Sequence, residues 1–287
     1  MKHELGINTN CECGKTLKET LENIKVAGFR NIMLSSKCGE IDVGLKLAKE
    51  LKLKVPYVHL PYRPPYGVSM INIWKHGVEN EATIDYFVDK IKLCEKYGVQ
   101  VAVMHTVNGL PQLENEINLQ VGIESIRKIL DATKDCAVKL AFENHSAAHN
   151  KYLKVLLDNI KDDRLGLCYD SGHHYLLTPD TNFLKDYGDR LFALHLQDNL
   201  MDAPDLNRFD RDLHLMPFDG KIDFEKVMHN IAKTRFSGII MLELHRQVVC
   251  SATPFYDMPP IDFLREAYRR AEKLAKMLDE TRSKLEK

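Results

Sequence analysis

Four apolar stretches in the second half of the chain each carry an acidic or imidazole side chain at or near their end. A charged group within a buried strand costs free energy unless it is paired or coordinated. Four such groups at matching positions therefore predict one shared site. The stretches are LAFENH (140–145), LGLCYD (165–170), LFALHL (191–196) and IIMLELH (239–245), and the side chains are Glu143, Asp170, His195 and Glu243.

Similar apolar runs recur along the whole chain, with amphipathic segments between them. The runs are nearly continuous rather than alternating, which is typical of parallel strands covered by helices. Eight strand-and-helix units predict an α/β fold, the (β/α)8 TIM barrel, in which a parallel eight-stranded closed sheet is surrounded by outer helices. No linker rich in Pro, Gly or Ser divides the chain, so we expect one domain over residues 1–287. The strands are expected from Leu5, Arg30, Val55, Val99, Ala137, Arg164, Arg190 and Gly238, and the clearest helices over 16–28, 83–98, 116–133, 224–234 and from Ile261.

Composition narrows the setting in which the protein acts. The chain has 40 Lys and Arg against 41 Asp and Glu, a formal net charge of -1, so it lacks the global basic field that attracts a polyanion, although a local patch stays open. The beginning, MKHELGINTN, has no apolar signal core, and no later run is long enough to cross a bilayer. Seven cysteines without a compact spacing suit a reducing compartment. We therefore expect a cytoplasmic protein without a membrane partner.

The barrel hypothesis places the chemistry, because side chains at the carboxyl ends of barrel strands converge on one mouth. The expected metal ligands are Glu143, Asp170, His195 and Glu243. Their O and N atoms suit zinc, manganese, magnesium or cobalt, so the ion is not identified. Further donors stand at equivalent places, and for each histidine among them a structural hydrogen bond and metal binding are equally good interpretations. These further donors are His59, His105, His173, Asp212 and His214.

These residues carry a resemblance to the superfamily of xylose-isomerase-like barrels, which includes sugar-phosphate isomerases and epimerases and endonuclease IV. The resemblance implies that the four expected ligands hold one divalent metal and that His173 contacts substrate or a further metal. Its specific motifs are ENH (143–145), DSGHH (170–174), HLQDN (195–199), DLHLMPFDGKIDF (212–224) and LELH (242–245).

The resemblance favours a divalent-metal-dependent sugar or sugar-phosphate isomerase or epimerase as the function. In such an enzyme the metal polarises the substrate oxygens and stabilises an enediolate. Glu143 and Glu243 would then act as the acid and base that move the proton. A hydride shift, also known in this superfamily, stays open.

The same resemblance supports a second hypothesis, a metal-dependent phosphodiesterase that acts on abasic DNA. Endonuclease IV binds three zinc ions, and His59, His105, Asp212 and His214 match its further ligands. Against it, the stretch PFDGKIDF is closer to the isomerase-like members, and a duplex requires basic side chains around the mouth. The candidate rim cations, Arg63, Lys75, Arg208, Arg211 and Lys221, are interspersed with aspartates, so nucleic acid is disfavoured as a partner. A barrel that binds metal and a polyol without turnover is a third hypothesis.

Two long connections, 62–77 and 199–221, are expected to cover the mouth. Trp74 in the first either stacks on a sugar ring or packs the connection onto the barrel, and both interpretations stay open. Arg211 in the second either binds a hydroxyl or phosphate group or pairs with an aspartate. A homo-oligomer is a family-level expectation. The substrate-binding candidates are thus His59, His105, His173, Arg211 and Trp74.

Overall fold

Eight parallel strands form one sheet in the computed structural model, which describes residues 3–35, 40–61, 69–107, 117–200, 211–247 and 258–286. The hydrogen-bonded order is β7-β6-β5-β4-β3-β2-β1-β8, so neighbours along the chain are neighbours in the sheet, as βαβ units require. The strands are β1 Leu5–Asn8, β2 Asn31–Ser35, β3 Lys54–His59, β4 Val101–Met104, β5 Lys139–Glu143, β6 Leu165–Asp170, β7 Leu191–His195 and β8 Ile240–Leu242.

The sheet closes between its first and last strands in this order. A parallel bridge joins Leu196, just beyond β7, to Leu242 of β8. The Leu196 N–H donates to the Met241 carbonyl over 3.0 Å, and the Glu243 N–H donates to the Leu196 carbonyl over 3.2 Å. The expected closed barrel of eight parallel strands is therefore confirmed.

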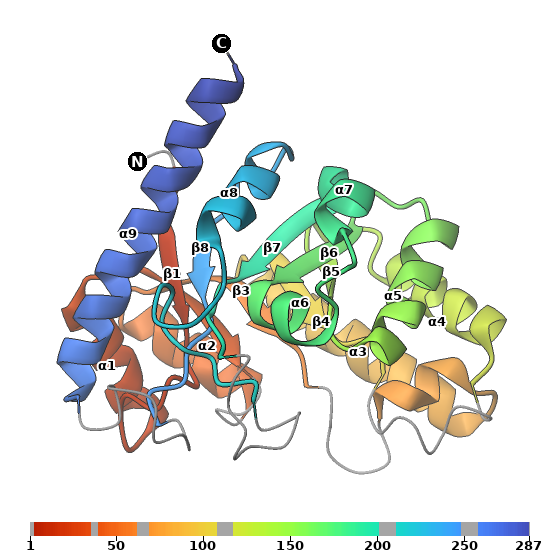
Figure 1. Ribbon diagram of the computed structural model, residues 1–287. Coiled ribbons are helices and arrows are strands. Elements are labelled where there is room, and N and C mark those ends of the chain that lie inside the picture. The colour runs from red at the N-terminus through yellow and green to blue at the C-terminus, as the bar shows by residue number, and fades with distance from the viewer. Residues whose placement is uncertain are drawn as a thin grey trace.

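Helices surround the strands, as Figure 1 shows. The long helix α9 runs beside β1 and packs against α1 and α8. The described helices are α1 Leu17–Ala27, α2 Ile41–Glu50, η2 Met70–Trp74, α3 Val78–Lys96, α4 Leu119–Ala132, α5 Ala147–Asn159, α6 Ser171–Leu177, α7 Phe183–Tyr187, η4 Gly188–Arg190, α8 Phe224–Ala232 and α9 Pro260–Leu285.

Local sequence explains where these helices begin and end. The Thr16 side chain accepts from the Glu19 N–H and caps α1, and Gly28 ends it with φ 115°, a conformation that favours glycine. Helix α3 begins at Val78 rather than at the expected residue 83. Two glutamates in its first turn favour this earlier start, because they oppose the positive end of the helix dipole.

The inside of the barrel and the layer outside it form separate apolar clusters. The larger cluster lies between the strands and the helices. The smaller one fills the barrel itself and consists of Met33, Tyr57, Val101, Val103, Ala141, Cys168, Ala193, Ile239 and Met241.

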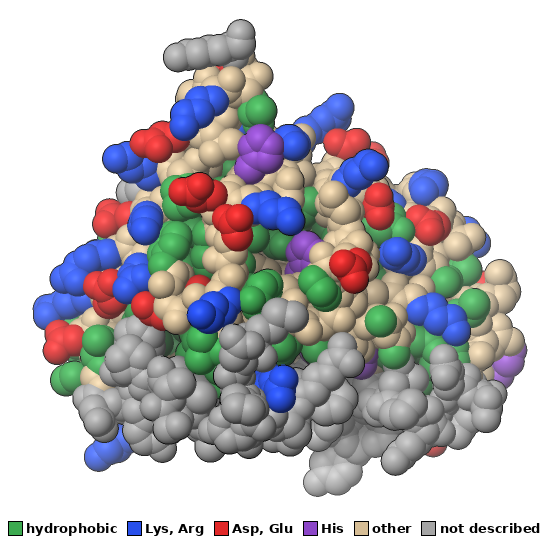
Figure 2. All heavy atoms as spheres, viewed as in Figure 1, with side chains coloured by type: hydrophobic (Ala, Val, Ile, Leu, Met, Phe, Trp, Pro, Cys, Tyr) green, Lys and Arg blue, Asp and Glu red, His purple; other side chains and the backbone are tan. Residues whose placement is uncertain are grey.

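The distribution of charge on the surface agrees with the nearly neutral net charge of the chain. Basic and acidic side chains are intermixed on the face drawn in Figure 2. No helix within the described ranges is long and apolar enough to span a membrane.

Candidate metal centre

The alternation of side chains along the strands brings six of the predicted ligands into the barrel. Successive residues of a strand point to opposite faces, so a residue two positions after an inward-facing one also faces inward. Ala141 of β5 lies in the inner cluster and Glu143 follows it by two residues. The same step leads from Tyr57 to His59, from Val103 to His105, from Cys168 to Asp170, from Ala193 to His195 and from Met241 to Glu243.

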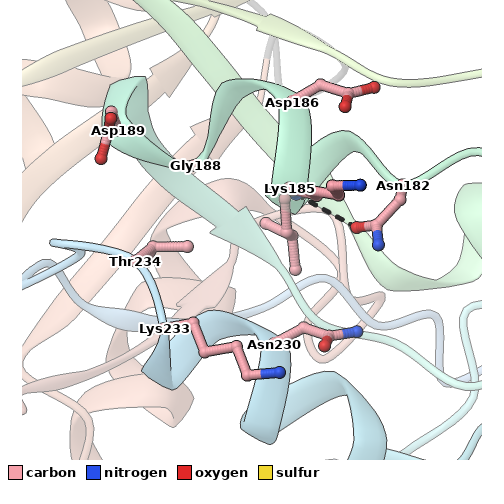
Figure 3. Close-up of a pocket in the computed structure, with 9 residues that line it drawn as sticks. Asn182, Lys185, Asp186, Gly188, Asp189, Asn230, Lys233 and Thr234 are labelled. Atoms are coloured by element: carbon pink, nitrogen blue, oxygen red, sulfur yellow. Dashed lines mark hydrogen bonds between the residues drawn. The ribbon is translucent and has the colours of Figure 1, made fainter.

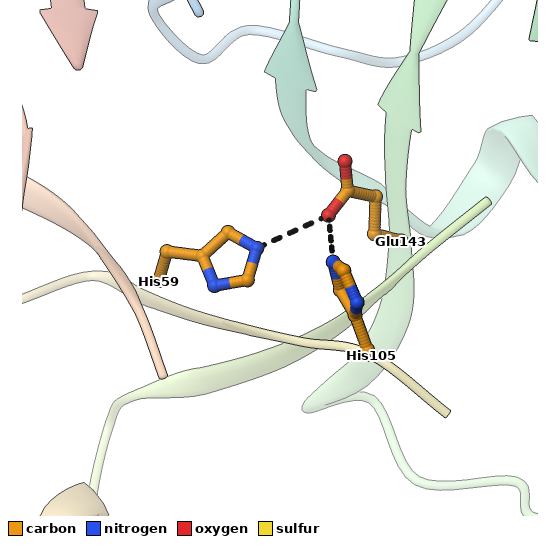
Figure 4. A group of neighbouring side chains, drawn as sticks. All are labelled: His59, His105 and Glu143. Carbon is orange, nitrogen blue, oxygen red and sulfur yellow. Dashed lines mark hydrogen bonds and ion pairs between the residues drawn. The ribbon is translucent and has the colours of Figure 1, made fainter. Parts of the chain in front are cut away.

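Glu143 is the central residue of the site. Its Oε2 lies 3.2 Å from His59 Nε2 and 2.9 Å from His105 Nε2, and both imidazoles point at it in Figure 4. Its Oε1 lies 3.0 Å from His195 Nδ1 and 3.3 Å from His173 Nδ1. The carboxylate is buried, with 2 % of the residue exposed, so its two oxygens face two different groups of donors.

These contacts belong to three groups of possible ligands, in each of which the donor atoms lie within 4.8 Å of one another. The first is His59, His105 and Glu143, and the second is Glu143, Asp170, His195 and Glu243. The third is His173, Asp212 and His214. All nine predicted metal and further-metal ligands are therefore brought together, and Glu143 is shared by the first two groups.

The third group depends on two segments that meet at the mouth. Asp212 Oδ2 lies 3.1 Å from His173 Nε2, at the beginning of α6, and 3.2 Å from His214 Nε2. His214 adopts a left-handed φ of 50°, a conformation that is uncommon for residues other than glycine. The ring is then held by its Nδ1–H, which donates to the Glu243 carbonyl over 3.0 Å.

Hydrogen bonds to carbonyl groups fix the tautomers of three of these histidines. Because a carbonyl can only accept, each Nδ1 must carry a proton, so in the neutral ring the lone pair that an ion needs is on Nε2. His59 Nδ1 donates to the Leu60 carbonyl over 3.0 Å, and His173 Nδ1 to the Asn144 carbonyl over 3.0 Å. His214 is held in the same way. The three Nε2 atoms that this arrangement frees are the ones that face carboxylate oxygens of the site.

Two amide side chains that follow β7 orient the acidic ligands. Gln197 Nε2 donates to Asp170 Oδ2 over 3.2 Å. Asn199 Nδ2 donates to Asp212 Oδ1 over 3.2 Å, and its Oδ1 accepts from the Leu213 N–H over 2.6 Å. Sequence reasoning did not assign a role to either amide. The motif HLQDN contained the signal, because three polar residues directly after a buried strand need partners.

Asp198, between these amides, organises the backbone after His214. Its carboxylate accepts from the N–H groups of Asn199 and Ile222 through Oδ1 and from those of Phe218 and Gly220 through Oδ2, over 2.9 to 3.0 Å. Asp198 and Leu215 also exchange two backbone hydrogen bonds of 2.9 Å. One buried carboxylate thus fixes the segment that carries part of the third group.

Three buried carboxylates, Glu143, Asp170 and Glu243, meet in the second group. Burial, together with the nearby charges of Glu143 and Glu243, raises the pKa of Asp170 to about 6. Burial alone would lower the pKa of His214, but the charge of Asp212, the hydrogen bond to it and the charges of Glu243 and Asp170 together outweigh burial and raise this pKa to about 9. Concentrated negative charge of this kind requires cations as partners.

The donor set fits divalent ions well. Imidazole nitrogens and carboxylate oxygens, which make up all three groups, are the ligands that zinc and manganese take in proteins. The residues described here are therefore suited to hold metal.

Comparison with known proteins identifies the family. The family model for the xylose isomerase-like TIM barrel matches residues 21–280. This chain belongs to that family. It is 26% identical over 257 residues to the inosose dehydratase of Bacillus velezensis, a match that covers 80% of this chain and 82% of that protein. It is 24% identical over 220 residues to the probable endonuclease 4 of Metamycoplasma arthritidis, covering 70% and 74%.

Solved structures confirm the fold of this xylose isomerase-like barrel. A D-tagatose 3-epimerase-like protein superposes with a TM-score of 0.71 at 18% identity and covers 98% of this chain and 99% of its own. The protein IOLI with a binding zinc atom superposes with a TM-score of 0.69 at 18% identity, covering 97% and 99%.

Trp74, expected among the substrate-binding residues, lies in the core instead of at the mouth. It is fully buried in η2, and its Nε1–H donates to the Thr106 carbonyl over 2.8 Å. Its ring lies 5.0 Å from that of Tyr152 and is so close to Gly122 that a Cβ there would stand 2.0 Å from it. This placement corrects the expected sugar contact. The packing interpretation describes Trp74, because the tryptophan joins η2 to α4 and α5.

We expect Trp74→Ala to lower the free energy of unfolding by about 3–5 kcal/mol, because it leaves a large cavity between three helices. Trp74→Phe should cost less and leave metal content unchanged. Urea denaturation of both variants measures the change in the free energy of unfolding. A Trp74→Ala protein of normal stability with impaired substrate binding would restore the sugar-contact interpretation.

Arg211 and the two long connections complete the predicted rim. Arg211 is partly exposed beside Asp212 in the chain, so its substrate contact stays a prediction. Residues 62–68 and 201–210, with Arg63 and Arg208, lie outside the described residues.

A separate hollow of about 340 Å³ lies away from the centre, at the amino ends of β7 and β8. Figure 3 shows Asp189 and Thr234 on opposite sides of it. None of the nine ligands lines it, so it plays no part in the site described above.

The raised pKa of His214 predicts how metal loading depends on pH. At pH 7 the metal-free protein keeps this imidazole protonated, since its pKa is about 9. An ion needs the neutral ring, so binding at pH 7 releases this proton, and the apparent affinity of the third group rises by up to about tenfold per pH unit for each proton released, until pH 9. Zinc titration calorimetry in two buffers of different ionisation enthalpy measures the release. Uptake without any released proton would contradict this prediction.

Proposed function

We propose that this xylose isomerase-like barrel is a divalent-metal-dependent hydrolase that cleaves a phosphoester bond with three ions held by its nine ligands. One observation carries the proposal: Glu143 directs its two oxygens to different ligand groups, and His173, Asp212 and His214 complete a third. Sites that hold more than one divalent ion are typical of phosphoryl chemistry, whereas a single ion suffices for moving a proton beside a carbonyl. The similarity to probable endonuclease 4 proteins supports the same choice.

The roles of the residues follow from their geometry. Glu143 would contribute one oxygen to an ion in the first ligand group and the other oxygen to an ion in the second, and Asp212 would act with His173 and His214 in the third. Divalent ions at these positions would polarise phosphoryl oxygens, lower the pKa of a water molecule and neutralise the charge that develops on the leaving oxygen. Zinc is the first ion to test, because a solved structure with the same fold holds a zinc atom.

The isomerase or epimerase hypothesis is retained as the second candidate. The observation that favours it is that Glu143 and Glu243 both approach His195 Nδ1, at 3.0 and 2.9 Å, and so flank one ligand group as an acid and base pair would. The similarity to an inosose dehydratase and to a D-tagatose 3-epimerase-like protein supports it. Against it, both oxygens of Glu143 are already engaged, which leaves this carboxylate poorly placed to take a proton from carbon.

The substrate class is proposed as the phosphoester of a sugar, whether free or at an abasic position of a strand. Both sources offer the same phosphoryl oxygens to the ligand groups. The two substrates differ in the length of phosphate backbone that the protein must bind. The chain has no excess of basic residues with which to bind a long nucleic-acid backbone.

Parallel assays of one zinc-loaded preparation separate the candidates. Cleavage of bis(4-nitrophenyl) phosphate, and of a sugar phosphate or an abasic duplex, is the expected result. A panel of free sugars in deuterated water tests the second candidate, because enediolate chemistry carries solvent deuterium into a C–H bond. Deuterium incorporation without any phosphoester cleavage would overturn the hydrolase proposal in favour of the isomerase.

A further inference from the structure

His145 is fixed in position at the mouth although it belongs to none of the three ligand groups. It stands two residues after Glu143, where β5 gives way to α5. Its backbone N–H donates to Asn150 Oδ1 over 2.7 Å, and its carbonyl accepts from Asn150 Nδ2 over 2.7 Å. Since both backbone groups are held by one buried side chain, the imidazole projects from a rigid base.

The ring of His145 lies between two of the ligand groups. Its centroid is 4.4 Å from that of His173, in the third group, and 5.6 Å from that of His105, in the first. His149 lies 4.5 Å away, outside all three groups. The imidazole of His145 therefore borders the space that a substrate must enter to reach the first and third ligand groups.

A backbone hydrogen bond settles which nitrogen of His145 carries the proton. The Ser146 N–H donates to His145 Nδ1 over 2.7 Å, so Nδ1 is the acceptor and the neutral ring has its proton on Nε2. Within the described ranges, no hydrogen bond is recorded for this Nε2–H. The side chain is partly exposed, so its one donor is available to a ligand at the mouth.

We infer that His145 binds the substrate, donating a hydrogen bond from Nε2 to a phosphoryl oxygen held between the first and third ligand groups. This inference rests on the proposed hydrolase function. A neutral imidazole suits this position beside the proposed metal ions. A protonated imidazole would be repelled by them, whereas the N–H dipole of the neutral ring is not. The donor strengthens its bond as charge accumulates on the oxygen, so it stabilises the transition state as well as the bound substrate.

Inorganic phosphate is the probe for this contact, with zinc-loaded protein and binding followed by calorimetry. We expect His145→Phe to weaken phosphate binding by about 10- to 100-fold, the effect of losing one hydrogen bond to a charged group, while the zinc content stays unchanged. His145→Gln should recover part of the affinity, because its amide N–H reaches a similar point. His149→Phe is the matched control, and we expect less than about a threefold change.

The outcomes separate the inference from the function on which it rests. If wild-type protein binds phosphate and His145→Phe binds it equally well, the inference is wrong and the hydrolase proposal stands. If zinc-loaded wild-type protein binds no phosphate, both are overturned. A loss in His145→Phe that glutamine does not restore, accompanied by lower zinc content or a lower melting temperature, would assign His145 a purely structural role and also overturn the inference.

Discussion

Glu143→Gln is expected to prevent binding of at least one of the two ions that this residue would bridge and to lower phosphoester hydrolysis on the order of 10³-fold. An amide has one oxygen where the carboxylate has two, so it cannot serve the first two ligand groups together. The loss corresponds to the several kcal/mol that a correctly placed ion contributes to a transition state. Zinc content by plasma emission and initial rates with bis(4-nitrophenyl) phosphate measure both effects.

The matched control for this change is Glu124→Gln. Glu124 is an exposed glutamate of α4 that bonds only to Gln120 among the described side chains. The Glu124→Gln protein should keep the wild-type zinc content and the wild-type rate of phosphoester hydrolysis. Glu143→Gln protein that retains all its zinc would show that this carboxylate does not bridge two positions.

Asp198→Ala is expected to lower the free energy of unfolding by about 3–5 kcal/mol and to abolish binding of the third ion. The substitution leaves four backbone N–H groups without their acceptor, and each buried unsatisfied group costs about 1–3 kcal/mol before water reaches it. The segment that these bonds hold continues from His214, so the imidazole loses its fixed direction. Urea denaturation and zinc counting report the two consequences separately.

Asp223→Ala is a suitable comparison for this prediction. Asp223 also accepts a backbone N–H, that of Lys226, but it does so once and from an exposed position at the start of α8. Its removal should cost about 1 kcal/mol without affecting zinc. Equal effects of the two variants would show that Asp198 acts only as an ordinary cap.

The barrel and the meeting of the candidate ligands at its mouth could be predicted from the sequence because both depend on local pattern. Each apolar run defines a strand, and side-chain alternation then decides which residues point inward. Glu143 and Asp170 were therefore assigned to the mouth correctly. The sequence left open whether one or three ions bind, because that depends on distances across the barrel, such as the approach of Glu143 to His59 and His105 from different strands.

The residues that support the ligands could not be assigned in the same way. Gln197 and Asp198 follow one strand, and sequence does not specify which of their neighbours need a donor or an acceptor. His145 is similar, because its role follows from a tautomer that the Ser146 N–H determines. The sequence left Trp74 between a sugar contact and packing, because the space for its ring is created by Gly122, a residue of a helix distant in the sequence.

Anomalous diffraction at the zinc edge, from crystals of the zinc-loaded protein, tests the central claim most directly. We predict three peaks: one beside Glu143 Oε2 and the histidines of β3 and β4, one among Glu143, Asp170, His195 and Glu243, and one between Asp212 and the imidazoles of His173 and His214. A single peak, with His59 and His105 still bonded to Glu143, would contradict a three-ion centre.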